Sequence, residues 1–239
     1  NRGEIMGIVG ESGSGKSTLG RSILRLLPIQ SGEIIFSGTN LAALPPKELR
    51  EFRKKMQMIF QDPYASLNPR MTVYETLAEP LIFHRVTNEK NITSRVASLM
   101  DEVGLPKTSM HKYPHEFSGG QRQRIAVGRA IGIKPELIIA DEPVSALDVT
   151  IQSQILELIA NLIERYSISM LFISHDLSVV RSITDRVAVM KSGKILEEEK
   201  TELLWRKPRN QYTQNLLRSI PIPDPRKERA RLLSRSGQN

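Results

Sequence analysis

The sequence predicts an α/β fold with a mostly parallel β-sheet that is flanked by helices. Short apolar stretches alternate along the chain with longer segments whose apolar residues recur at helical spacing, which is typical of a parallel sheet covered on both faces. The first apolar stretch, residues 5–9, runs directly into a glycine-rich segment, residues 10–18, that opens a helix. We expect a first domain at 1–200, with a helical subdomain inserted at about 73–132, and an extension at 201–239.

Turn residues and apolar periodicity define the elements in the first half of the chain. The helix after the glycine-rich segment is expected to end near Pro28, and glycines bracket a short strand at 32–38. Pro45 indicates a helix start, because proline fits the first turn of a helix. Alternating apolar residues predict a buried strand at 56–60, and turn formers at 62–69 predict an irregular loop.

The second half of the chain continues the alternation after a helical insertion. From 73 to 116 the apolar spacing is helical, and the i, i+3, i+4 and i+7 positions of one face are Val96, Leu99, Met100 and Val103. A second glycine-rich segment, 118–121, then opens another helix. The remaining expected elements are a strand at 136–140, a helix from Thr150, a strand at 170–174 and a hairpin at 187–196.

The glycine-rich segment is predicted to be a phosphate-binding loop, the centre of a P-loop NTPase core. It has the pattern G-x-x-x-x-G-K-[ST], with an apolar strand before it and a helix after it. Backbone N–H groups of such a loop close around phosphate oxygens, and the positive end of the helix faces the same anion. Lys16 is expected to reach the β- and γ-phosphates, and the Ser17 hydroxyl to complete the shell of Mg²⁺. The expected phosphate-binding residues are Gly10, Ser12, Gly13, Ser14, Gly15, Lys16, Ser17 and Thr18.

Polar side chains follow each of the other predicted core strands. Gln61 follows the second, Asp141 and Glu142 the third, and His175 the fourth. Because the carboxyl ends of parallel strands meet at one edge of a sheet, we expect these groups to converge on the phosphate loop. Simpler roles remain open for each: Glu142 as a helix-capping acid, Gln61 as an ordinary strand-end residue, and His175 as a core or surface histidine.

Composition limits the class of protein. The 239 residues are 39% hydrophobic and 25% charged, as in ordinary globular proteins. No apolar run approaches the roughly 18 residues that span a bilayer, so we expect that the chain does not cross a membrane by itself and has a cytosolic location. The absence of Cys excludes disulfides, thiolate zinc sites and iron–sulfur clusters in this chain.

The net charge of +8 is concentrated at the end of the chain. Residues 206–239 hold nine basic and two acidic side chains, which accounts for +7 of the +8. A nucleic-acid-binding protein more often carries its basic stripe on the fold itself, so we expect no direct contact with nucleic acid. The basic tail instead indicates a solvated arm or a contact with an anionic membrane surface.

Six motifs along the chain, with Glu142 counted together with residues 137–141, resemble those of one large family. Residues 118–121, SGGQ, match the signature motif of ATP-binding-cassette (ABC) transporters, although Phe117 stands where the family normally has Leu. The other matching positions are the phosphate-binding loop at 10–18, Gln61, residues 137–141, Glu142, residues 145–148 and His175. The chain resembles the nucleotide-binding subunit of an ABC transporter from residue 3 to about residue 200, and this implies the ABC ATPase fold.

Three further segments resemble the oligopeptide and dipeptide importer branch of that family. They are residues 60–70, residues 143–149, and residues 211–217 with the proline-rich 220–225 after them. In that branch, a carboxyl-terminal extension is found in importers of peptides, nickel and glutathione. For Tyr212 and the rest of this extension, packing, a solvated arm and a regulatory role all remain open.

The resemblance implies ATP and Mg²⁺ as cofactors and a role for each motif. Asp141 is implied to hold Mg²⁺ together with Ser17 and Gln61, and Glu142 to deprotonate the attacking water. The implied catalytic residues are Lys16, Gln61, Glu142 and His175. Two subunits of the family close face to face. The signature residues are implied to contact the ATP of the partner subunit, and they are Ser118, Gly119, Gly120 and Gln121. Asp148 is implied to link the two ATP sites.

The resemblance also implies partners and a location. They are transmembrane permease subunits, a second ATPase subunit that is identical or a sister chain, and an extracytoplasmic solute-binding protein, with this chain at the cytoplasmic face of the cell membrane. The alternatives are an importer ATPase for nickel, glutathione or another small solute, a non-transport ABC ATPase acting on nucleic acid or ribosomes, or a folded fragment without turnover. Family members carry further residues ahead of Gly3, including an aromatic that stacks on adenine. We therefore expect ATP binding by the printed sequence to be weaker by about 1–3 kcal/mol.

Overall fold

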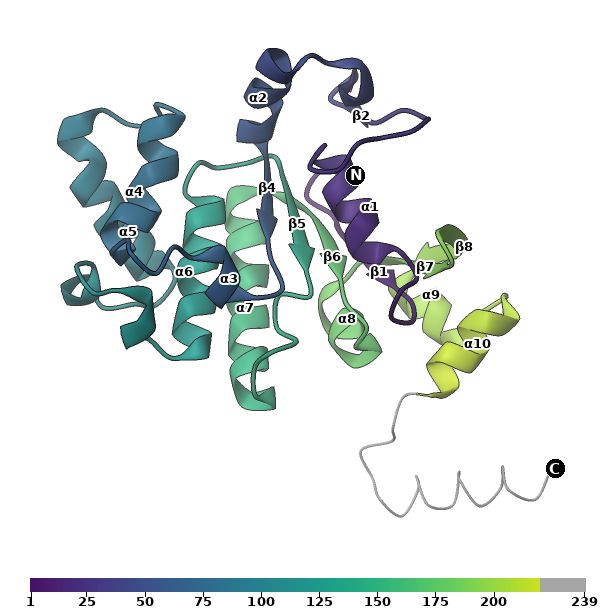
Figure 1. The fold of residues 1–239 in the computed structure, drawn as a ribbon. Coiled ribbons are helices and arrows are strands. Elements are labelled where there is room, and N and C mark those ends of the chain that lie inside the picture. Colours follow the sequence, from purple (N-terminus) through teal and green to yellow (C-terminus); the bar gives the residue numbers. More distant parts are fainter. Residues whose placement is uncertain (220–239) are drawn as a thin grey trace.

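The computed structural model describes residues 1–219, and a six-stranded sheet forms their centre (Figure 1). The strand order is β4-β5-β6-β1-β7-β8, in which β8 is antiparallel to β7 and every other pair is parallel. A separate two-stranded hairpin pairs β2 with β3. The strands are β1 (Ile5–Val9), β2 (Ile35–Phe36), β3 (Thr39–Asn40), β4 (Met56–Ile59), β5 (Leu137–Asp141), β6 (Ser169–Ile173), β7 (Arg186–Lys191) and β8 (Lys194–Lys200). The predicted α/β class and mostly parallel sheet are confirmed.

Helices connect these strands. The α-helices are α1 (Lys16–Ile23), α2 (Pro46–Lys55), α3 (Pro63–Ser66), α4 (Val73–Phe83), α5 (Ile92–Glu102), α6 (Gly119–Ile131), α7 (Val149–Tyr166), α8 (Leu177–Ile183), α9 (Thr201–Arg206) and α10 (Gln211–Arg218). Short 3-10 helices are η1 (Leu41–Ala43), η2 (Glu89–Asn91), η3 (Lys107–Ser109) and η4 (Pro114–Glu116). Within residues 1–219, none of the helices combines the length and the apolar character needed to cross a bilayer.

Apolar side chains on both faces of the sheet explain why it is buried between helices. Successive residues of a strand point to opposite faces. Accordingly, Ile138 of β5 packs in a cluster with Ile155 of α7, whereas its neighbour Ile139 packs in a second cluster with Leu24 and with Leu49 of α2. A continuous apolar run such as that of β5 is what a strand covered on both faces requires.

Helices α4 and α5 lie beside the β4 edge of the sheet, and α6 leads from them back onto it (Figure 1). Val96, Leu99 and Met100 of α5 and the adjacent Val103 are fully buried, so the helical face read from their spacing is confirmed. Helix α4 starts at a capping box in which Thr72 and Glu75 satisfy each other's backbone N–H groups. The bounds of a helical subdomain at about 73–132 remain a prediction.

Three local predictions differ from the structure. The segment after Gln61 is not wholly irregular, because the Asp62 side chain accepts a hydrogen bond from Tyr64 N and Pro63 occupies the first turn, which together start the short helix α3. Of the strand expected at 32–38, only β2 is formed, and it pairs with β3 in a short hairpin. The helix expected to end near Pro28 already ends at Ile23.

The extension after residue 200 packs onto the domain as far as residue 219. Thr201 and Leu204 of α9 and Thr213 of α10 are buried, so this part is not a solvated arm. Residues 220–239, which contain the proline-rich segment 220–225 and the rest of the basic tail, lie outside the described residues.

Candidate phosphate-binding site

The loop between β1 and α1 is held in a tight curve by glycines and by the neighbouring hairpin. Gly13 and Gly15 have φ values of 77° and 101°, in the left-handed region that side chains disfavour. A Cβ on Gly10 would come within 2.1 Å of the Met190 carbonyl oxygen, so only glycine fits there. From the turn between β7 and β8, Gly193 N donates to Ser14 O at 2.9 Å. The loop therefore curves back toward the start of α1.

Lys16 is the first residue of α1, and its ammonium group lies inside the loop. Lys16 Nζ donates to Gly10 O at 2.8 Å and to Glu11 O at 2.9 Å, and it lies 3.5 Å from Ser14 Oγ. Burial lowers the pKa of Lys16, while the nearby carboxylates Glu142 and Asp141 act in the opposite direction. A buried ammonium group among carbonyls and N–H groups is well placed to attract phosphate oxygens.

Ser17 and Asp141 meet beneath the loop. The Ser17 hydroxyl donates to Asp141 Oδ1 at 2.7 Å, although the two residues are 124 positions apart. Asp141, the last residue of β5, is fully buried, and its other oxygen, Oδ2, has no hydrogen-bond partner within the described residues. Arg21 NH2 lies 3.7 Å from that oxygen.

These groups fit a magnesium ion. Mg²⁺ takes hard oxygen ligands, commonly one or two protein groups with phosphate oxygens and waters. A hydroxyl beside a buried carboxylate with one unbonded oxygen provides that donor set, and a cation would also offset the cost of burying the charge. Within residues 1–219 no three His, Asp or Glu side chains gather into a complete metal cage, so phosphates and waters would complete the shell.

Glu142 stands at the rim of the same site between two polar partners. Gln61 Nε2 donates to Glu142 Oε2 at 2.9 Å, and His175 Nδ1 lies 3.0 Å from Glu142 Oε1. Glu142 itself has a φ of 49°, a left-handed conformation that costs a side-chain-bearing residue roughly 1–2 kcal/mol. Its backbone N donates to Ile173 O of β6 at 2.9 Å, which fixes this turn against the neighbouring strand. The convergence expected from the strand ends is therefore observed.

Together these groups line a single cavity of about 520 Å³. The residues that line it are Ser12, Gly13, Gly15, Lys16, Ser17, Thr18, Gln61, Glu142 and His175. Gly10 and Ser14 lie behind it, where they hold Lys16, and Asp141 contacts it through Ser17.

The second glycine-rich segment lies elsewhere. Ser118 and Gln121 form a capping box at the start of α6, and a Cβ on Gly120 would come within 2.6 Å of Ile151 Cγ2 in α7. Asp148 occupies the N-cap position of α7, where its side chain makes no capping hydrogen bond, and it is exposed. None of Ser118, Gly119, Gly120, Gln121 and Asp148 lines the cavity that contains Lys16.

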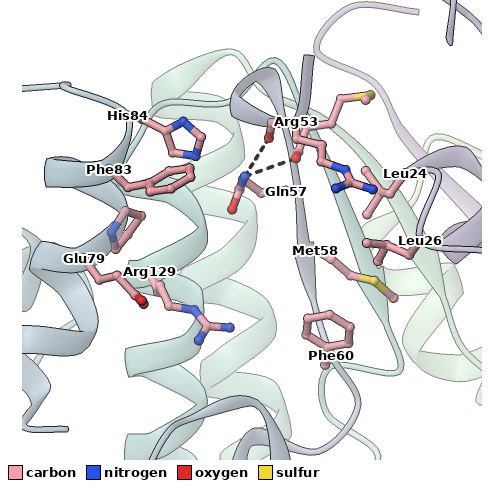
Figure 2. A pocket seen from close by; sticks show the side chains of 12 residues that line it. Leu24, Leu26, Arg53, Gln57, Met58, Phe60, Glu79, Phe83, His84 and Arg129 are labelled. Carbon is pink, nitrogen blue, oxygen red and sulfur yellow. Dashed lines mark hydrogen bonds between the residues drawn. The ribbon is translucent and has the colours of Figure 1, made fainter. Parts of the chain in front are cut away.

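A second cavity, of about 390 Å³, lies between α4 and β4 and has a different character (Figure 2). Figure 2 shows Phe83 and Glu79 on one side, Leu24 and Leu26 on the other, and Met58 between them. Three of its polar side chains bond the backbone: Arg53 NH2 donates to Arg25 O, Arg129 NH1 to Ser66 O, and Gln57 Nε2 to Arg53 O and Met56 O. Glu79 and His84 also line the cavity. Most of the surface of this cavity is apolar.

Sequence reasoning missed two residues at the phosphate site. Arg21 lies four positions after Ser17, hence on the same face of α1, and this i,i+4 spacing could have indicated its approach to Asp141. Tyr212 accepts a hydrogen bond from Glu11 N in the loop at 3.2 Å. Nothing in the local sequence around Tyr212 indicates this contact.

The phosphate loop follows β1, and Asp141 and Glu142 lie at the end of β5, a parallel strand separated from β1 by β6. A phosphate loop with acids at the end of another parallel strand defines a P-loop nucleoside triphosphatase. The family model described as "ABC transporter" matches residues 1–145 of this chain. The oligopeptide transport ATP-binding protein OppF of Bacillus subtilis is 52% identical over 233 residues, which are 97% of this chain and 76% of that protein. A putative peptide import ATP-binding protein of Brucella ovis is 50% identical over 94% of this chain and 71% of its own length.

Solved structures agree with these matches. The dimeric post-hydrolysis state of the ATP-binding cassette MJ0796, bound to ADP and Pi, is similar at a TM-score of 0.75 and 31% identity, over 84% of this chain and 87% of that chain. Clostridium perfringens cbiO1, part of the ABC transporter complex cbiONQ, is similar at a TM-score of 0.80 and 26% identity, over 96% of this chain and 88% of that chain. This chain therefore belongs to the ABC transporter family, in which it is an ATP-binding cassette with ATPase activity.

Proposed function

We propose that this chain is the ATP-hydrolysing subunit that energises import of oligopeptides or dipeptides by an ABC transporter. The observation that carries the catalytic part is the position of Glu142 at the rim of the Lys16 cavity, between Gln61 and His175. The solute class is supported separately by relatives that are named for oligopeptide transport and peptide import. Nickel, glutathione or another small solute is the alternative cargo.

In the proposed mechanism the protein contributes position and charge rather than a covalent intermediate. Lys16 neutralises charge on the β- and γ-phosphates, and the loop amides hold the phosphate oxygens. Glu142 accepts a proton from the attacking water; each of its oxygens has one partner, Gln61 or His175, and can accept a second hydrogen bond. His175 then hydrogen-bonds the γ-phosphate and the water.

Ser17, Asp141 and Gln61 are the residues that we propose hold Mg²⁺. When bound, the ion neutralises charge that develops on the phosphates. Asp141 is buried and accepts a hydrogen bond from the Ser17 hydroxyl at 2.7 Å, so these two proposed ligands lie next to each other.

We propose that two such subunits form the working unit. Ser118, Gly119, Gly120 and Gln121 lie outside the Lys16 cavity, which supports a role in binding the ATP of a partner subunit. Asp148, exposed at the start of α7, is suited to contact that partner. One of the similar solved structures is described as a dimeric ABC transporter cassette.

Transmembrane permease subunits and an extracytoplasmic solute-binding protein complete the proposed transporter, which puts this chain at the cytoplasmic face of the cell membrane. The apolar cavity beside β4 is suited to the permease, because Leu26 and Phe83 at its lining are 47% and 55% exposed. Exposed apolar side chains gathered around a cavity are typical of a protein contact.

The first experiment tests hydrolysis and dimerisation together. Glu142→Gln keeps the shape of the side chain but cannot accept a proton as a carboxylate does. We expect ATP turnover to fall by roughly 10²-fold or more, within the range for loss of a general base. Light scattering should then detect a dimer in the presence of Mg-ATP and a monomer without it.

The other outcomes identify what is wrong with the proposal. Wild-type turnover in the Glu142→Gln protein would contradict the catalytic role of Glu142. A monomer that binds ATP would instead indicate that the working partner is a sister subunit.

The permease contact is tested at Phe83. Phe83→Asp places a charge in the apolar cavity, and we expect the variant to lose co-purification with the permease subunits while its ATP affinity stays unchanged. Ile195→Asp is the matched control, because Ile195 is similarly exposed, at 46%, on β8 at the opposite edge of the sheet. Equal loss in both variants would argue against a contact at this cavity.

A further inference from the structure

Helix α10, from the carboxyl-terminal extension, touches the phosphate loop directly. The Tyr212 hydroxyl accepts a hydrogen bond from Glu11 N at 3.2 Å, across 201 positions of sequence. Figure 1 shows α10, in yellow, on the side of the sheet formed by β7 and β8. An element outside the predicted nucleotide-binding domain therefore contacts the loop that binds phosphate.

The contacted N–H belongs to a peptide group that also holds Lys16. Glu11 N and Gly10 O are the two ends of the same planar peptide unit. Lys16 Nζ donates to that Gly10 oxygen at 2.8 Å, in a buried position. The Tyr212 hydroxyl, the Gly10–Glu11 peptide and the Lys16 ammonium group thus form one continuous hydrogen-bonded chain.

Tyr212 is itself held by several contacts. Asn210 Oδ1 accepts from Tyr212 N at 2.8 Å and caps α10. Glu197 of β8 accepts from Arg209 N at 2.7 Å and from Asn210 N at 3.0 Å, which fixes the start of the helix. Lys191 Nζ lies 4.6 Å from the centre of the Tyr212 ring, a cation–π contact. The hydroxyl is therefore presented to the loop from a well-anchored helix.

We propose that Tyr212 is a positioning residue for Lys16, and that it acts by fixing the orientation of the Gly10–Glu11 peptide. This inference rests on the proposed function, because the contact of Lys16 with the phosphates of ATP is itself proposed. Rotation of the peptide would break the Tyr212 bond and move the Gly10 oxygen away from Lys16 at the same time. Hydrogen bonds in such a chain also polarise one another, so the Tyr212 bond strengthens the hold on the ammonium group.

The test compares Tyr212→Phe with Tyr74→Phe. Tyr212→Phe removes only the hydroxyl and leaves the ring beneath Lys191. Tyr74→Phe removes a hydroxyl that pairs with Thr93 Oγ1 at 3.2 Å, away from the phosphate loop, and is the matched control. Equilibrium binding of Mg-ATP, hydrogen exchange of the Glu11 amide and the melting temperature are measured for both variants, for the wild type and for Lys16→Ala.

We expect Tyr212→Phe to weaken ATP binding by roughly 3–10-fold, the equivalent of one modest hydrogen bond. The Glu11 amide should exchange faster, because its N–H loses its partner. The melting temperature should stay within about 2 °C of the wild type, since the hydroxyl adds little to the packing of α10. Tyr74→Phe should match the wild type in ATP affinity and in Glu11 exchange.

Two results would overturn the inference alone. The first is that Lys16→Ala weakens ATP binding while Tyr212→Phe keeps the wild-type ATP affinity. The other is a loss of affinity in Tyr212→Phe without faster exchange at Glu11, because the hydroxyl would then not act through this peptide. Wild-type ATP affinity in the Lys16→Ala protein would instead overturn the proposed role of Lys16, and the inference with it.

Discussion

Ser17 joins the phosphate loop to the acid at the end of β5, and a single substitution tests what that contact does. Ser17→Ala removes both the hydroxyl that donates to Asp141 Oδ1 and the proposed Mg²⁺ ligand. We expect the Mg²⁺-dependent gain in ATP affinity to fall by about tenfold, while affinity measured in EDTA changes little. Ser22→Ala, on the same helix, is the control. An unchanged Mg²⁺ dependence in Ser17→Ala would remove Ser17 from the proposed metal site.

At the scale of single residues, the sequence predicts some contacts of the site and not others. Lys16, Gln61, Glu142 and His175 were expected to converge because each follows a core strand, a rule that needs only the strand order along the chain. The hydrogen bond from Gln61 to Glu142 and the bond to the loop from Tyr212 could not be predicted, because they depend on side-chain directions across 81 and 201 positions.

Between elements, a partly buried carboxylate links α5 to α7. Glu102 accepts hydrogen bonds from Arg95 NH1 and Tyr166 Oη, at 2.8 and 2.7 Å, and from Ser98 Oγ at 3.0 Å. Burial acts to raise the pKa of Glu102, but these donors outweigh it and lower the pKa below its usual 4.5. Helix α5 is therefore held against α7 by hydrogen bonds to a charged group as well as by apolar packing.

Tyr166→Phe tests this link through its pH dependence. We expect a loss of about 1 kcal/mol in the free energy of unfolding at pH 7, because one donor to a partly buried carboxylate disappears. A carboxyl group whose pKa is lowered by folding stabilises the protein above its unfolded pKa, and this stabilisation is lost as the pH falls through its folded pKa. The difference between Tyr166→Phe and the wild type should therefore shrink below about pH 4.5. Denaturant unfolding at several pH values measures it, and a difference that stays constant with pH would contradict it.

The elements themselves were predicted best where their signals are local. The strands β1, β4, β5 and β6 lie within a residue or two of their expected positions, because each is a short, mostly apolar run next to turn signals. Helix α3 was missed because turn formers and a one-turn helix share the same residues, here Asp62 and Pro63. The packing of α9 and α10 is not predictable from the local sequence, because it depends on distant partners: α9 contacts β7 and β8, and Leu216 and Leu217 of α10 pack against the main apolar cluster.

In the whole molecule, the two groups proposed to bind one ATP lie apart in the same chain. Lys16 lines the phosphate cavity, whereas Ser118 starts α6 outside it. If the loop of one copy and the signature motif of another bind the same ATP, two differently defective proteins should form one intact site when they pair. One protein has a defective loop, and the other has a defective signature motif. Lys16→Ala and Ser118→Arg are the two variants, and each alone should show no ATP turnover.

An equal mixture of the two should regain activity. Random pairing of a symmetric dimer makes half of the dimers mixed, and each mixed dimer holds one intact site of two, so the expected turnover is up to about a quarter of the wild-type value. Turnover is measured on each variant, on the mixture and on the wild type at the same total concentration. A Ser118→Arg protein with wild-type turnover would contradict a role for the signature motif in hydrolysis. A mixture as inactive as its components would mean that this chain does not complete its own site, so that the second subunit is a different chain.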